Sequence, residues 1–223
     1  MLLAAGFGSR MAPLTDTCPK PLLKVGTQPQ IDYIVNSFTT TGVDTFIVNA
    51  WYLSEQVQDH FKGRENATVI VESERLETGG GVKNALPHLS DVFFVANTDS
   101  IIMNADISIL HMQESFDDTM DGLLLLVPKD NATGYIGDGD FSIMKDGTLV
   151  RDSNGGYVFS GVQILRSHVF ENTQEGAFSL NVIYNKLLEQ GRLKGTIHKG
   201  AWHHISTPND VEKTNALFMS GAV

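Results

Sequence analysis

The sequence predicts an α/β fold, because short and continuously apolar segments alternate with segments whose apolar residues recur at helical spacing. Residues 46–48, 69–71 and 92–95 are apolar without interruption, which is typical of strands buried on both faces of a sheet. Strands that are separated by helices usually pair in parallel. We therefore expect a three-layer, Rossmann-like sandwich with a mostly parallel central sheet.

Two helices in the first half follow from the spacing of apolar residues. Residues 30–41 carry apolar side chains at positions i, i+3, i+4 and i+7 from Ile31, and Gly42 follows as a helix stop. The same kind of spacing from Leu53 to Phe61 marks the next helix.

The chain becomes more irregular after about residue 128. Residues 131–139 are rich in Gly, Asp and Asn and are expected to form a loop. Residues 157–165 have the composition of a strand. Ser179 is the expected cap of a helix that Gly191 stops.

The last helix has a distinct start signal. Thr207 is followed by Pro208 and, three positions on, by Asp210, which is the pattern of a capped helix with Pro at its first position. We expect this helix to run to about Met219.

Composition bounds the class of protein. The 223 residues are 42% hydrophobic, enough for one large core or for one core with a small subdomain. There are 26 acidic against 16 basic residues, so nucleic-acid binding is not expected as a main role. The single Cys18 cannot form an internal disulfide, which fits a reducing cytoplasm. The apolar run near residues 123–127 is too short to span a membrane, and the start lacks the charged region of a signal peptide.

The N-terminal segment combines features of a phosphate-binding site. Gly6 and Gly8 allow a sharp turn whose N–H groups approach a ligand closely. Arg10 offers a planar fork of donors that suits phosphate oxygens. Lys20 stands between two prolines, which bias the chain around it towards a stiff, extended form. Positive charge beside a glycine loop in an acidic protein predicts an anionic ligand.

Two better-known phosphate loops are excluded. A P-loop needs Gly-Lys followed by Ser or Thr, which the chain lacks, and Met11 stands where the dinucleotide fingerprint needs a third small residue. The segment instead resembles the signature of the sugar-1-phosphate nucleotidyltransferases, L-A-A-G-x-G-[ST]-R-[ML]-x-P-L-T followed by P-K-P-[LM]. Residues 3–15 and 19–22 carry this signature here.

The resemblance extends over nearly the whole chain. It implies the nucleotide-diphospho-sugar transferase fold for residues 1–223 as a single domain, with a nucleotide-binding half over 1–128 and a sugar-binding half over 129–223. The family usually has a few more residues before the first Leu of the signature, so we expect the natural start to lie upstream of Met1. No C-terminal β-helix or other extension is expected.

The resemblance also implies an activity. Members of the family are enzymes that join a nucleoside triphosphate to a sugar 1-phosphate and release pyrophosphate, a reaction whose main demands are positioning and charge neutralisation. It implies that Arg10 holds the β- and γ-phosphates, that Lys20 bridges the α-phosphate and the sugar phosphate, and that Asp99 binds the metal. The nucleotide-binding residues carried over are Ala4, Ala5, Gly6, Phe7, Gly8, Ser9, Thr78, Gly79 and Gly80.

Asp99 is a candidate on physical grounds as well. It follows the apolar segment 92–95, and a carboxylate at the carboxyl end of a buried parallel strand lies where ligands bind in open α/β sheets. The family has N-[GS]-D here, and its Asp holds Mg²⁺ between the nucleotide phosphates. The expected cofactor is therefore Mg²⁺, with Mn²⁺ as an alternative.

His204 is the main departure from the family pattern. The segment from Trp202 to Pro208 resembles W-x-D-[IV]-G-T-P, in which the Asp is a second magnesium ligand, but His204 occupies that position and Ser206 replaces the Gly. Imidazole suits softer metals than Mg²⁺. Three interpretations are open: Asp99, phosphates and waters suffice for the metal; His204 contacts phosphates or sugar; or the protein binds a nucleotide sugar without efficient catalysis. A zinc site is not favoured, since no Cys or third His lies at suitable spacing.

Sugar contacts are implied by residues in both halves of the chain. The run Glu77 to Gly81 places three glycines at a helix start, and its E-T-G-G-G form is typical of a bacterial branch that resembles N-acetylmuramate-1-phosphate uridylyltransferases. A G-x-F-x-L stretch begins at Gly176 and matches the same branch. The candidate sugar-binding residues are Asn49, Glu77, Gly81, Asn97, Asp140, Ser160, Gly161 and Glu175.

The substrate pair is less constrained than the reaction. The E-T-G-G-G form and the G-x-F-x-L stretch favour UTP with N-acetylmuramic acid 1-phosphate, a cell-wall recycling reaction. GTP with mannose or heptose 1-phosphate is the alternative, and a cytidylyltransferase for choline or another small phospho-acceptor is a related one. A non-catalytic nucleotide-sugar sensor is the alternative of another class. The expected partners are these small molecules, without nucleic acid or membrane, and the expected state is a monomer or homodimer in the cytoplasm.

Overall fold

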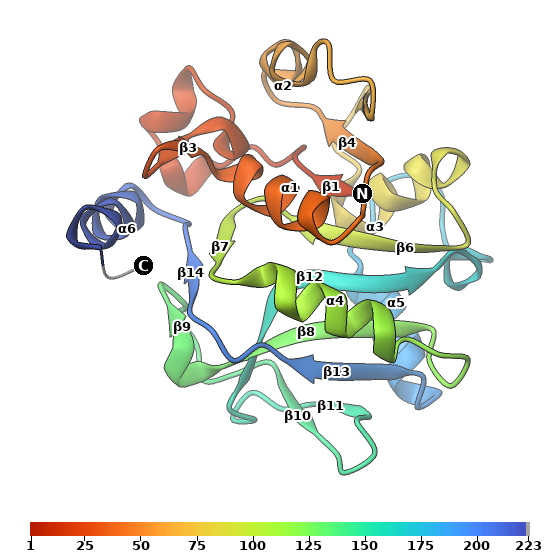
Figure 1. Ribbon diagram of the computed structural model, residues 1–223. Helices are drawn as coiled ribbons and strands as arrows, with labels where there is room; N and C mark the ends of the chain where they lie inside the picture. The colour runs from red at the N-terminus through yellow and green to blue at the C-terminus, as the bar shows by residue number, and fades with distance from the viewer. Residues whose placement is uncertain (222–223) are drawn as a thin grey trace.

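A nine-stranded sheet runs through the centre of the protein in the computed structural model, which describes residues 1–221 (Figure 1). Its strands are β1 (Leu2–Leu3), β4 (Phe46–Ala50), β5 (Ala67–Val71), β6 (Val92–Asn97), β8 (Gly122–Pro128), β10 (Phe141–Ile143), β11 (Leu149–Arg151), β12 (Tyr157–Arg166) and β13 (Leu193–Ile197). Two small sheets lie apart from it and consist of β7 (Ser100–Ile102), β14 (Trp202–His204) and β9 (Ala132–Thr133), and of β2 (Lys24–Val25) and β3 (Gln28–Pro29).

The sheet is mixed but mostly parallel. Strands β6, β1, β4 and β5 pair in parallel, and β13 pairs in parallel with β8. Strand β12 lies between β6 and β8 and is antiparallel to both, so β8 and β13 run in the same direction as the first four strands. The reversal of β12 was not foreseen, because an apolar strand has the same pattern in either direction.

Residues 1–221 contain six α-helices, of which five flank the central sheet and α6 packs beside β2 of a small sheet. They are α1 (Gln30–Thr40), α2 (Ser54–Phe61), α3 (Glu77–Ala85), α4 (Ala105–Ser115), α5 (Asn181–Glu189) and α6 (Pro208–Ser220). Short 3₁₀ turns connect the elements and comprise η1 (Ser9–Met11), η2 (Leu14–Asp16), η3 (Lys20–Leu22), η4 (Leu86–His88), η5 (Lys129–Asn131) and η6 (Ser167–Phe170). Within the described chain, no helix combines the length and apolar content that crossing a membrane requires.

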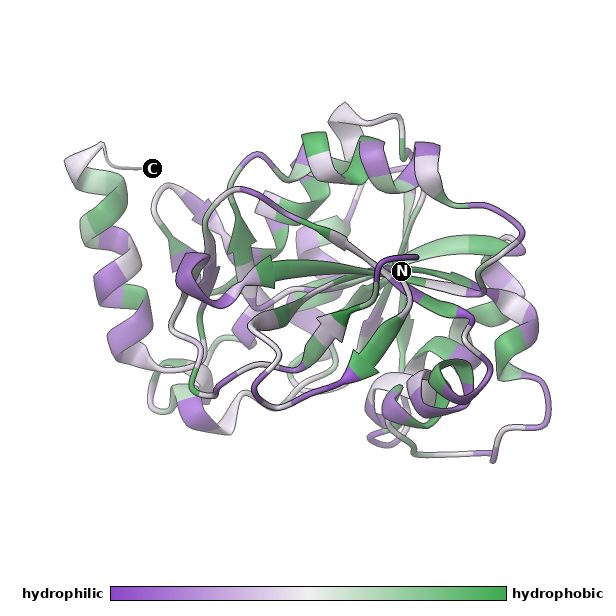
Figure 2. Ribbon diagram, turned by 90° about the horizontal axis from the view of Figure 1, so that it is seen from below, coloured by the Kyte–Doolittle hydropathy of each residue, from purple (hydrophilic) through white to green (hydrophobic). Residues whose placement is uncertain are grey.

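Two cores separate the three layers. Helices α1, α2 and α4 pack on one face of the sheet, and Figure 1 shows α1 and α4 in front of it. Helices α3 and α5 pack on the other face. Along β8, Leu123 and Leu125 face the first core while Leu124 and Leu126 face the second, as the two-residue period of a strand requires. The ribbon coloured by hydropathy shows hydrophobic strands inside and hydrophilic stretches on the surrounding helices (Figure 2).

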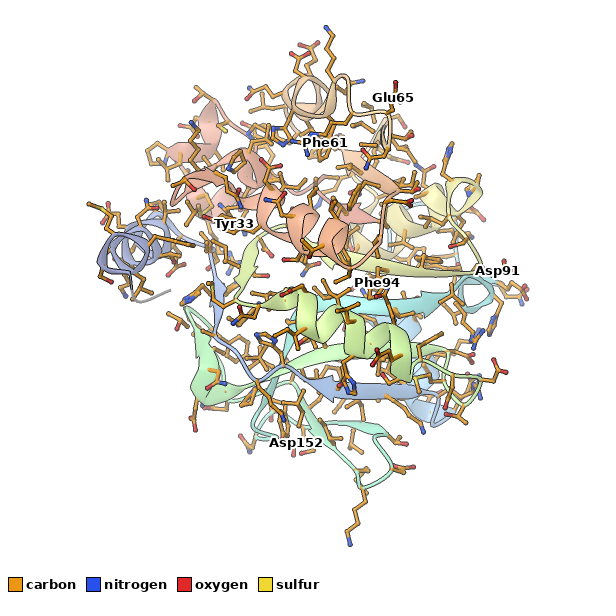
Figure 3. All side chains as sticks on the ribbon, in the orientation of Figure 1. Tyr33, Phe61, Glu65, Asp91, Phe94 and Asp152 are labelled. Atoms are coloured by element: carbon orange, nitrogen blue, oxygen red, sulfur yellow. The ribbon has the colours of Figure 1, made fainter. Side chains whose placement is uncertain are left out.

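The predicted elements are largely confirmed. The helices expected from apolar spacing and the strands expected from apolar runs all form, and Phe94 of β6 lies in the layer beside α1, with its ring 5.0 Å from that of Phe38 (Figure 3). The last helix begins with the expected capping box between Thr207 and Asp210 and with Pro208 at its start. The expectation that Ser179 caps its helix was wrong by one position: Leu180 stands at the cap of α5 without a side-chain cap, while the Ser179 hydroxyl, one residue earlier, accepts from Asn181 N at 3.2 Å.

One local expectation was wrong. The prolines around Lys20 do not hold it in an extended segment, because Lys20–Leu22 forms the 3₁₀ turn η3 after an extended Pro19. Proline is tolerated at the start of a helical turn, where its missing N–H would have had no partner in the turn. The turn is closed by Leu23 N, which donates to Lys20 O at 3.1 Å.

The capping box of α6 gives a stability prediction. Burial would raise the pKa of Asp210, but hydrogen bonds from Thr207 and Ser206 outweigh burial and hold that pKa below its ordinary value. Replacing Asp210 by Ala should therefore lower the free energy of unfolding by ~1 kcal/mol at neutral pH. A carboxyl group with a lowered folded-state pKa stabilises the fold only while it is ionised, so the difference should disappear as the pH falls through that pKa.

Urea unfolding of both proteins over a series of pH values measures this difference. Asn209→Ala, at an exposed position in the same turn, is the matched control and should leave the stability unchanged. Equal stability of Asp210→Ala and the parent protein at neutral pH would contradict the capping role.

Candidate active site

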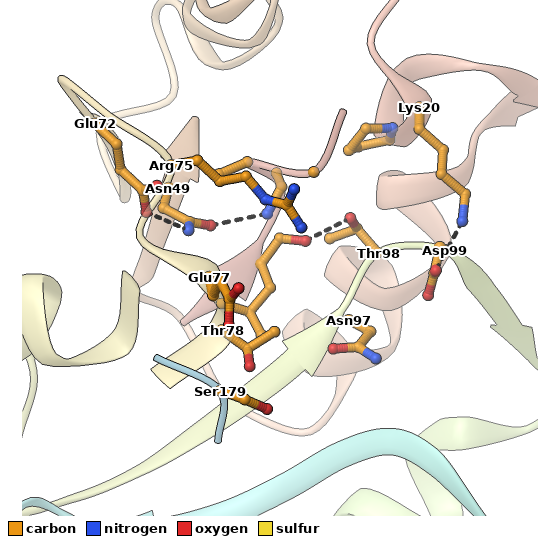
Figure 4. A pocket seen from close by; sticks show the side chains of 15 residues that line it. Lys20, Asn49, Glu72, Arg75, Glu77, Thr78, Asn97, Thr98, Asp99 and Ser179 are labelled. Carbon is orange, nitrogen blue, oxygen red and sulfur yellow. Dashed lines mark hydrogen bonds and ion pairs between the residues drawn. The ribbon is translucent and has the colours of Figure 1, made fainter. Parts of the chain in front are cut away.

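A cavity of about 400 Å³ opens at the carboxyl ends of β1, β4, β5 and β6 (Figure 4). Parallel α/β sheets bind ligands at this edge, because loops that follow several strands converge there. The predicted site residues that line it are Ala4, Ala5, Gly6, Lys20, Asn49, Glu77, Thr78, Asn97 and Asp99. The lining residues that were not predicted are Leu3, Pro21, Glu72, Arg75, Thr98 and Ser179.

The glycine loop leaves β1 and turns over the cavity. The N–H groups of Ala5, Gly6 and Phe7 donate to no acceptor within residues 1–221, so they are free to meet a ligand. Gly8 has a φ of +69°, and a Cβ there would lie 3.0 Å from the methyl group of Thr15 and 3.1 Å from Lys20 Cβ. Gly8 therefore serves both the turn and the passage of the Lys20 side chain.

Phe7 of the glycine loop does not line the cavity. The ring of Phe7 is half exposed and packs on Tyr52 at 4.4 Å between centroids. Ser9 and Arg10 are exposed on η1, and neither side chain contributes to the lining of the cavity. Arg10 nevertheless stands close enough to His204 to contribute to lowering its pKa.

Lys20 and Asp99 form the charged centre of the site. Lys20 Nζ lies 2.7 Å from Asp99 Oδ2, and the two side chains are 13% and 29% exposed. Burial would raise the pKa of Asp99, but the charges of Lys20 and His204 and the hydrogen bond from Lys20 outweigh it and hold that pKa below its ordinary value. A cation and an ionised carboxylate thus meet at the edge where the glycine loop ends.

His204 stands next to this pair through strand pairing. Strand β14 is antiparallel to β7, and Ile205 N donates to Asp99 O at 3.0 Å. The imidazole stacks on Trp202 with centroids 5.4 Å apart, and its Nδ1 is buried without a hydrogen-bond partner in the described chain. Burial lowers the pKa of His204, and Lys20 and Arg10 lower it further while Asp99 opposes them. Burial and the two cations therefore favour the neutral form of the ring.

The side chains near Asp99 fit a metal ion that takes most of its ligands from water and from the substrate. No group of three or more His, Cys, Asp or Glu side chains within residues 1–221 is arranged to hold an ion. Asp99 supplies one carboxylate to the cavity lining, and His204, whose Nδ1 has no partner in the described chain, lies outside the lining but close enough to Asp99 for that carboxylate to oppose the lowering of its pKa. Mg²⁺ commonly takes one or two carboxylates, several waters and substrate phosphates, so this arrangement fits Mg²⁺ once a triphosphate is present.

Asn49 lines the cavity and also has two protein partners. Its side chain is buried, its Oδ1 accepts from Ala4 N at 2.8 Å, and its Nδ2 donates to Glu72 Oε1 at 2.7 Å. The predicted sugar contact of Asn49 stays a prediction. Glu72 was missed because a single acidic residue after an apolar segment carries no motif, although its place at the carboxyl end of β5 was a usable signal.

The glycines of α3 serve packing more than ligand binding. The N–H groups of Gly79 and Gly80 both donate to Phe178 O, at 2.8 and 3.1 Å, and are therefore unavailable to a nucleotide. A Cβ on Gly79 would collide with the Phe178 ring, and one on Gly81 would lie 2.7 Å from Asn49 Nδ2. These three glycines were expected to seat the ligand, but only Glu77 and Thr78 of this run line the cavity.

The predicted sugar-binding residues of the second half divide into two groups. Gly161 lies behind the cavity, where its φ is +93° and a Cβ would lie 2.8 Å from Asn97 Cβ, so it makes room for a lining side chain. Ser160 is buried, and its carbonyl accepts from Trp202 Nε1 at 3.1 Å. Gly161 and Ser160 therefore support the site from behind.

The other two predicted residues lie outside the cavity. Asp140 accepts from Phe159 N at 2.9 Å and from the Tyr135 hydroxyl at 3.1 Å, which fastens its loop to β12. Glu175 is 91% exposed and pairs with Lys83 at 2.6 Å. Both were predicted from short sequence matches, and both are held by the protein itself.

Arg75 and Ser179 are functional candidates that the sequence did not reveal. Arg75 is an exposed cation on the loop between β5 and α3, and its guanidinium has no ion-pair partner in residues 1–221. Ser179 reaches the lining because Leu180 N donates to the Thr78 hydroxyl at 2.9 Å, which ties this segment to α3. Neither position has a recognisable pattern in the sequence, since both depend on contacts between distant segments.

Comparison with known proteins identifies the family. The nucleotidyl transferase family model matches residues 1–137. A relative named N-acetylmuramate alpha-1-phosphate uridylyltransferase, from Caulobacter vibrioides, is 35% identical over 93% of this chain and 91% of its own. A relative of the same name from Neisseria meningitidis is 32% identical over 97% of this chain and 96% of its own.

Solved structures share the fold. HddC from Yersinia pseudotuberculosis, complexed with GMP-PN, superposes with a TM-score of 0.78 at 24% identity and covers 97% of each chain. The inositol-1-phosphate CTP transferase from T. maritima superposes with a TM-score of 0.77 at 20% identity over 99% of this chain and 95% of its own. The predicted fold class and the predicted family are thereby confirmed. With its N-terminal signature folded around the cavity, the family model matched over residues 1–137, and two relatives at 35% and 32% identity, this chain belongs to the nucleotidyl transferase family.

Proposed function

We propose that this protein joins UTP to N-acetylmuramic acid 1-phosphate. A phosphate oxygen of the sugar 1-phosphate attacks the α-phosphorus of UTP, the bond to the β-phosphate breaks, and pyrophosphate leaves with formation of the UDP-sugar. The observation that carries the reaction type is the Lys20–Asp99 pair, 2.7 Å apart, beside a glycine loop with free N–H groups. The names of the two relatives that match nearly the full chain support this substrate pair.

Two cationic side chains and the backbone of the glycine loop are proposed to bind different parts of the substrates. Lys20 reaches the cavity and is placed to bridge the α-phosphate and the attacking sugar phosphate. Arg10 is exposed at the rim, where its planar fork suits the β- and γ-phosphates and the departing pyrophosphate. The free N–H groups of Ala5 to Phe7 are placed to seat the nucleotide. Nothing in this scheme requires a covalent intermediate.

Members of this family generally use a divalent cation, and we propose Mg²⁺ held by Asp99 and substrate phosphates. When bound, it offsets the repulsion between the two polyanionic substrates. Lys20 would then exchange its contact with Asp99 for the phosphates. His204, near Asp99, would contact a substrate phosphate and would add no second negative charge to the site.

Pyrophosphate release across a grid of substrates tests the proposed function. With Mg²⁺, we expect strong release from UTP with N-acetylmuramic acid 1-phosphate and weak release from GTP, CTP or dTTP with mannose, glucose or N-acetylglucosamine 1-phosphates. Strong release from GTP with mannose 1-phosphate would move the protein to GDP-sugar synthesis. If protein that binds nucleotide releases no pyrophosphate from any substrate pair, with Mg²⁺ or with Mn²⁺, the result would favour a nucleotide-sugar sensor and overturn the proposal.

Lys20→Ala should lower kcat by roughly 10²-fold or more, because it removes the cation that contacts charge developing in the transition state. Steady-state kinetics and a thermal melt of the same preparation measure activity and folding separately. Lys24→Ala, an exposed lysine in the same basic segment, is the matched control and should retain parental kcat. If Lys20→Ala kept full turnover, the catalytic centre would lie elsewhere.

Asp99→Asn should remove most metal-dependent activity, since an amide oxygen is a weaker ligand for a hard cation than a carboxylate. Turnover is measured against Mg²⁺ concentration, and the half-saturating Mg²⁺ concentration should rise together with the loss of kcat. The control is Asp59→Asn, at an exposed position on α2. An unchanged Mg²⁺ dependence in Asp99→Asn would place the metal at other residues.

A further inference from the structure

A chain of hydrogen bonds connects the glycine loop, on one side of the cavity, with the start of α3 on the other side. Asn49 at the end of β4 accepts from Ala4 N at 2.8 Å and donates to Glu72 Oε1 at 2.7 Å. The second carboxylate oxygen, Glu72 Oε2, accepts from Leu76 N at 3.3 Å. The link therefore runs from the start of the glycine loop, through two side chains, to the residue before α3. Figure 4 shows the contacts of Asn49 with the loop and with Glu72.

The direction of each hydrogen bond in this link is fixed. Backbone N–H groups at Ala4 and Leu76 can only donate, and the two oxygens of Glu72 are the acceptors in this link. The amide of Asn49 must therefore present its oxygen to Ala4 and its nitrogen to Glu72. Both side chains are buried, at 3% and 4% exposure, so water cannot replace a lost partner without rearrangement.

The pair also sets the space that surrounds it. A Cβ on Gly81 would lie 2.7 Å from Asn49 Nδ2 and 2.9 Å from Glu72 Oε1, closer than real Cβ contacts. Helix α3 can approach β4 and β5 at this point only because Gly81 has no side chain. The polar pair and the glycine thus form one packed unit.

The glycine loop depends on this unit at its strand end. At its far end the loop is held by Gly8 O, which accepts from Met11 N at 2.8 Å and from the Thr15 hydroxyl at 3.0 Å. Between these anchors, the N–H groups that face a ligand have no partner in the described chain. The Ala4–Asn49 hydrogen bond therefore connects the ligand-facing backbone, through Glu72, to the start of α3.

We infer that Asn49 and Glu72 act as a positioning pair, which fixes the glycine loop against the start of α3 and so sets the affinity for the nucleoside triphosphate. The inference rests on the proposed function in taking this cavity as the nucleotide site. The pair acts through the backbone of Ala4 to Phe7 and through the Leu76 end of α3, and neither side chain needs to touch the transferred phosphate. Pre-organisation of this kind raises affinity by removing the cost of ordering the loop.

Reversing the polarity of the pair tests this inference. In Glu72→Gln, one amide N–H must face either Asn49 Nδ2 or Leu76 N, which places two donors together. In Asn49→Asp, two buried carboxylates face one another.

The double variant, Asn49→Asp with Glu72→Gln, restores a complete set of donors and acceptors. The carboxylate introduced at position 49 would accept from Ala4 N. The amide introduced at position 72 would donate its N–H to that carboxylate, and its oxygen would accept from Leu76 N. All three hydrogen bonds are therefore restored. The single difference is that residue 72 now donates to residue 49, whereas in the parent protein residue 49 donates to residue 72.

UTP affinity with Mg²⁺, measured by calorimetry, is the main readout. Each single variant should bind UTP at least about tenfold more weakly, and the double variant should return to within about threefold of the parent protein. The KM for the sugar 1-phosphate should change less than the KM for UTP in every variant. Asn84→Asp and Glu74→Gln, exposed neighbours that make the same chemical changes, are the controls.

Hydrogen exchange supplies a readout without any ligand. Peptides that cover residues 4–11 should exchange faster in each single variant and recover in the double variant, while melting temperatures identify any global loss of fold. Failure of the double variant to restore either exchange or affinity would overturn the inference. A change of base preference in Glu72→Gln alone, with Asn49→Asp unaffected, would also overturn it, since the carboxylate would then contact the nucleotide directly.

These outcomes are distinct from a failure of the proposed function. If the parent protein releases no pyrophosphate from any substrate pair, the proposed reaction falls, but loop exchange still tests the pair. If the parent turns over and the double variant recovers nothing, only the positioning inference falls.

Discussion

The register of β1 governs the geometry of the whole cavity. Leu3 stands opposite Asn49 on β4 and opposite Asn97 on β6, so two amide side chains flank the point where the glycine loop begins. A slip of β1 by one residue would turn the side chains of Leu2 and Leu3 to the opposite faces of the sheet and would move the start of the glycine loop away from both amides. The Thr98 hydroxyl donates to Leu3 O at 2.8 Å and supports this register from the β6 side. The glycine loop, Asn49 and the strand that leads to Asp99 are therefore positioned by these two strand pairings.

The charged centre joins segments that are far apart in the chain. Lys20 lies 79 positions before Asp99, and its side chain reaches the carboxylate by passing a glycine in the loop. Asp99 is held from the other side by Ile205, whose N–H donates to the Asp99 carbonyl. The corner around Asp99 therefore draws on both halves of the chain, and the change of composition near residue 128 does not coincide with a boundary of the site.

Prediction from the sequence worked where one segment carries its own signal. The signature from Leu3 to Leu22 indicated the glycine loop, Lys20 and, through the family resemblance, Asp99. It could not show that Gly79 and Gly80 give their N–H groups to Phe178, because that contact joins segments about 100 residues apart. The direction of β12 and the burial of Glu72 depend on tertiary contacts for the same reason. Local patterns determine elements, whereas partners across the sheet determine which polar groups remain free.

The glycines of this protein meet two separate physical needs. Around Gly6 there is open space and no protein atom within 4 Å of where a Cβ would stand, which is the arrangement that a bound ligand requires. At Gly81 and Gly161 a Cβ would meet Asn49 or Asn97, so these glycines admit side chains of the site instead of a substrate. Gly81 and Gly161 therefore build the cavity from behind, by allowing the side chains of Asn49 and Asn97 to approach the backbone. The precision of the cavity's geometry rests on how tightly those hidden contacts are packed.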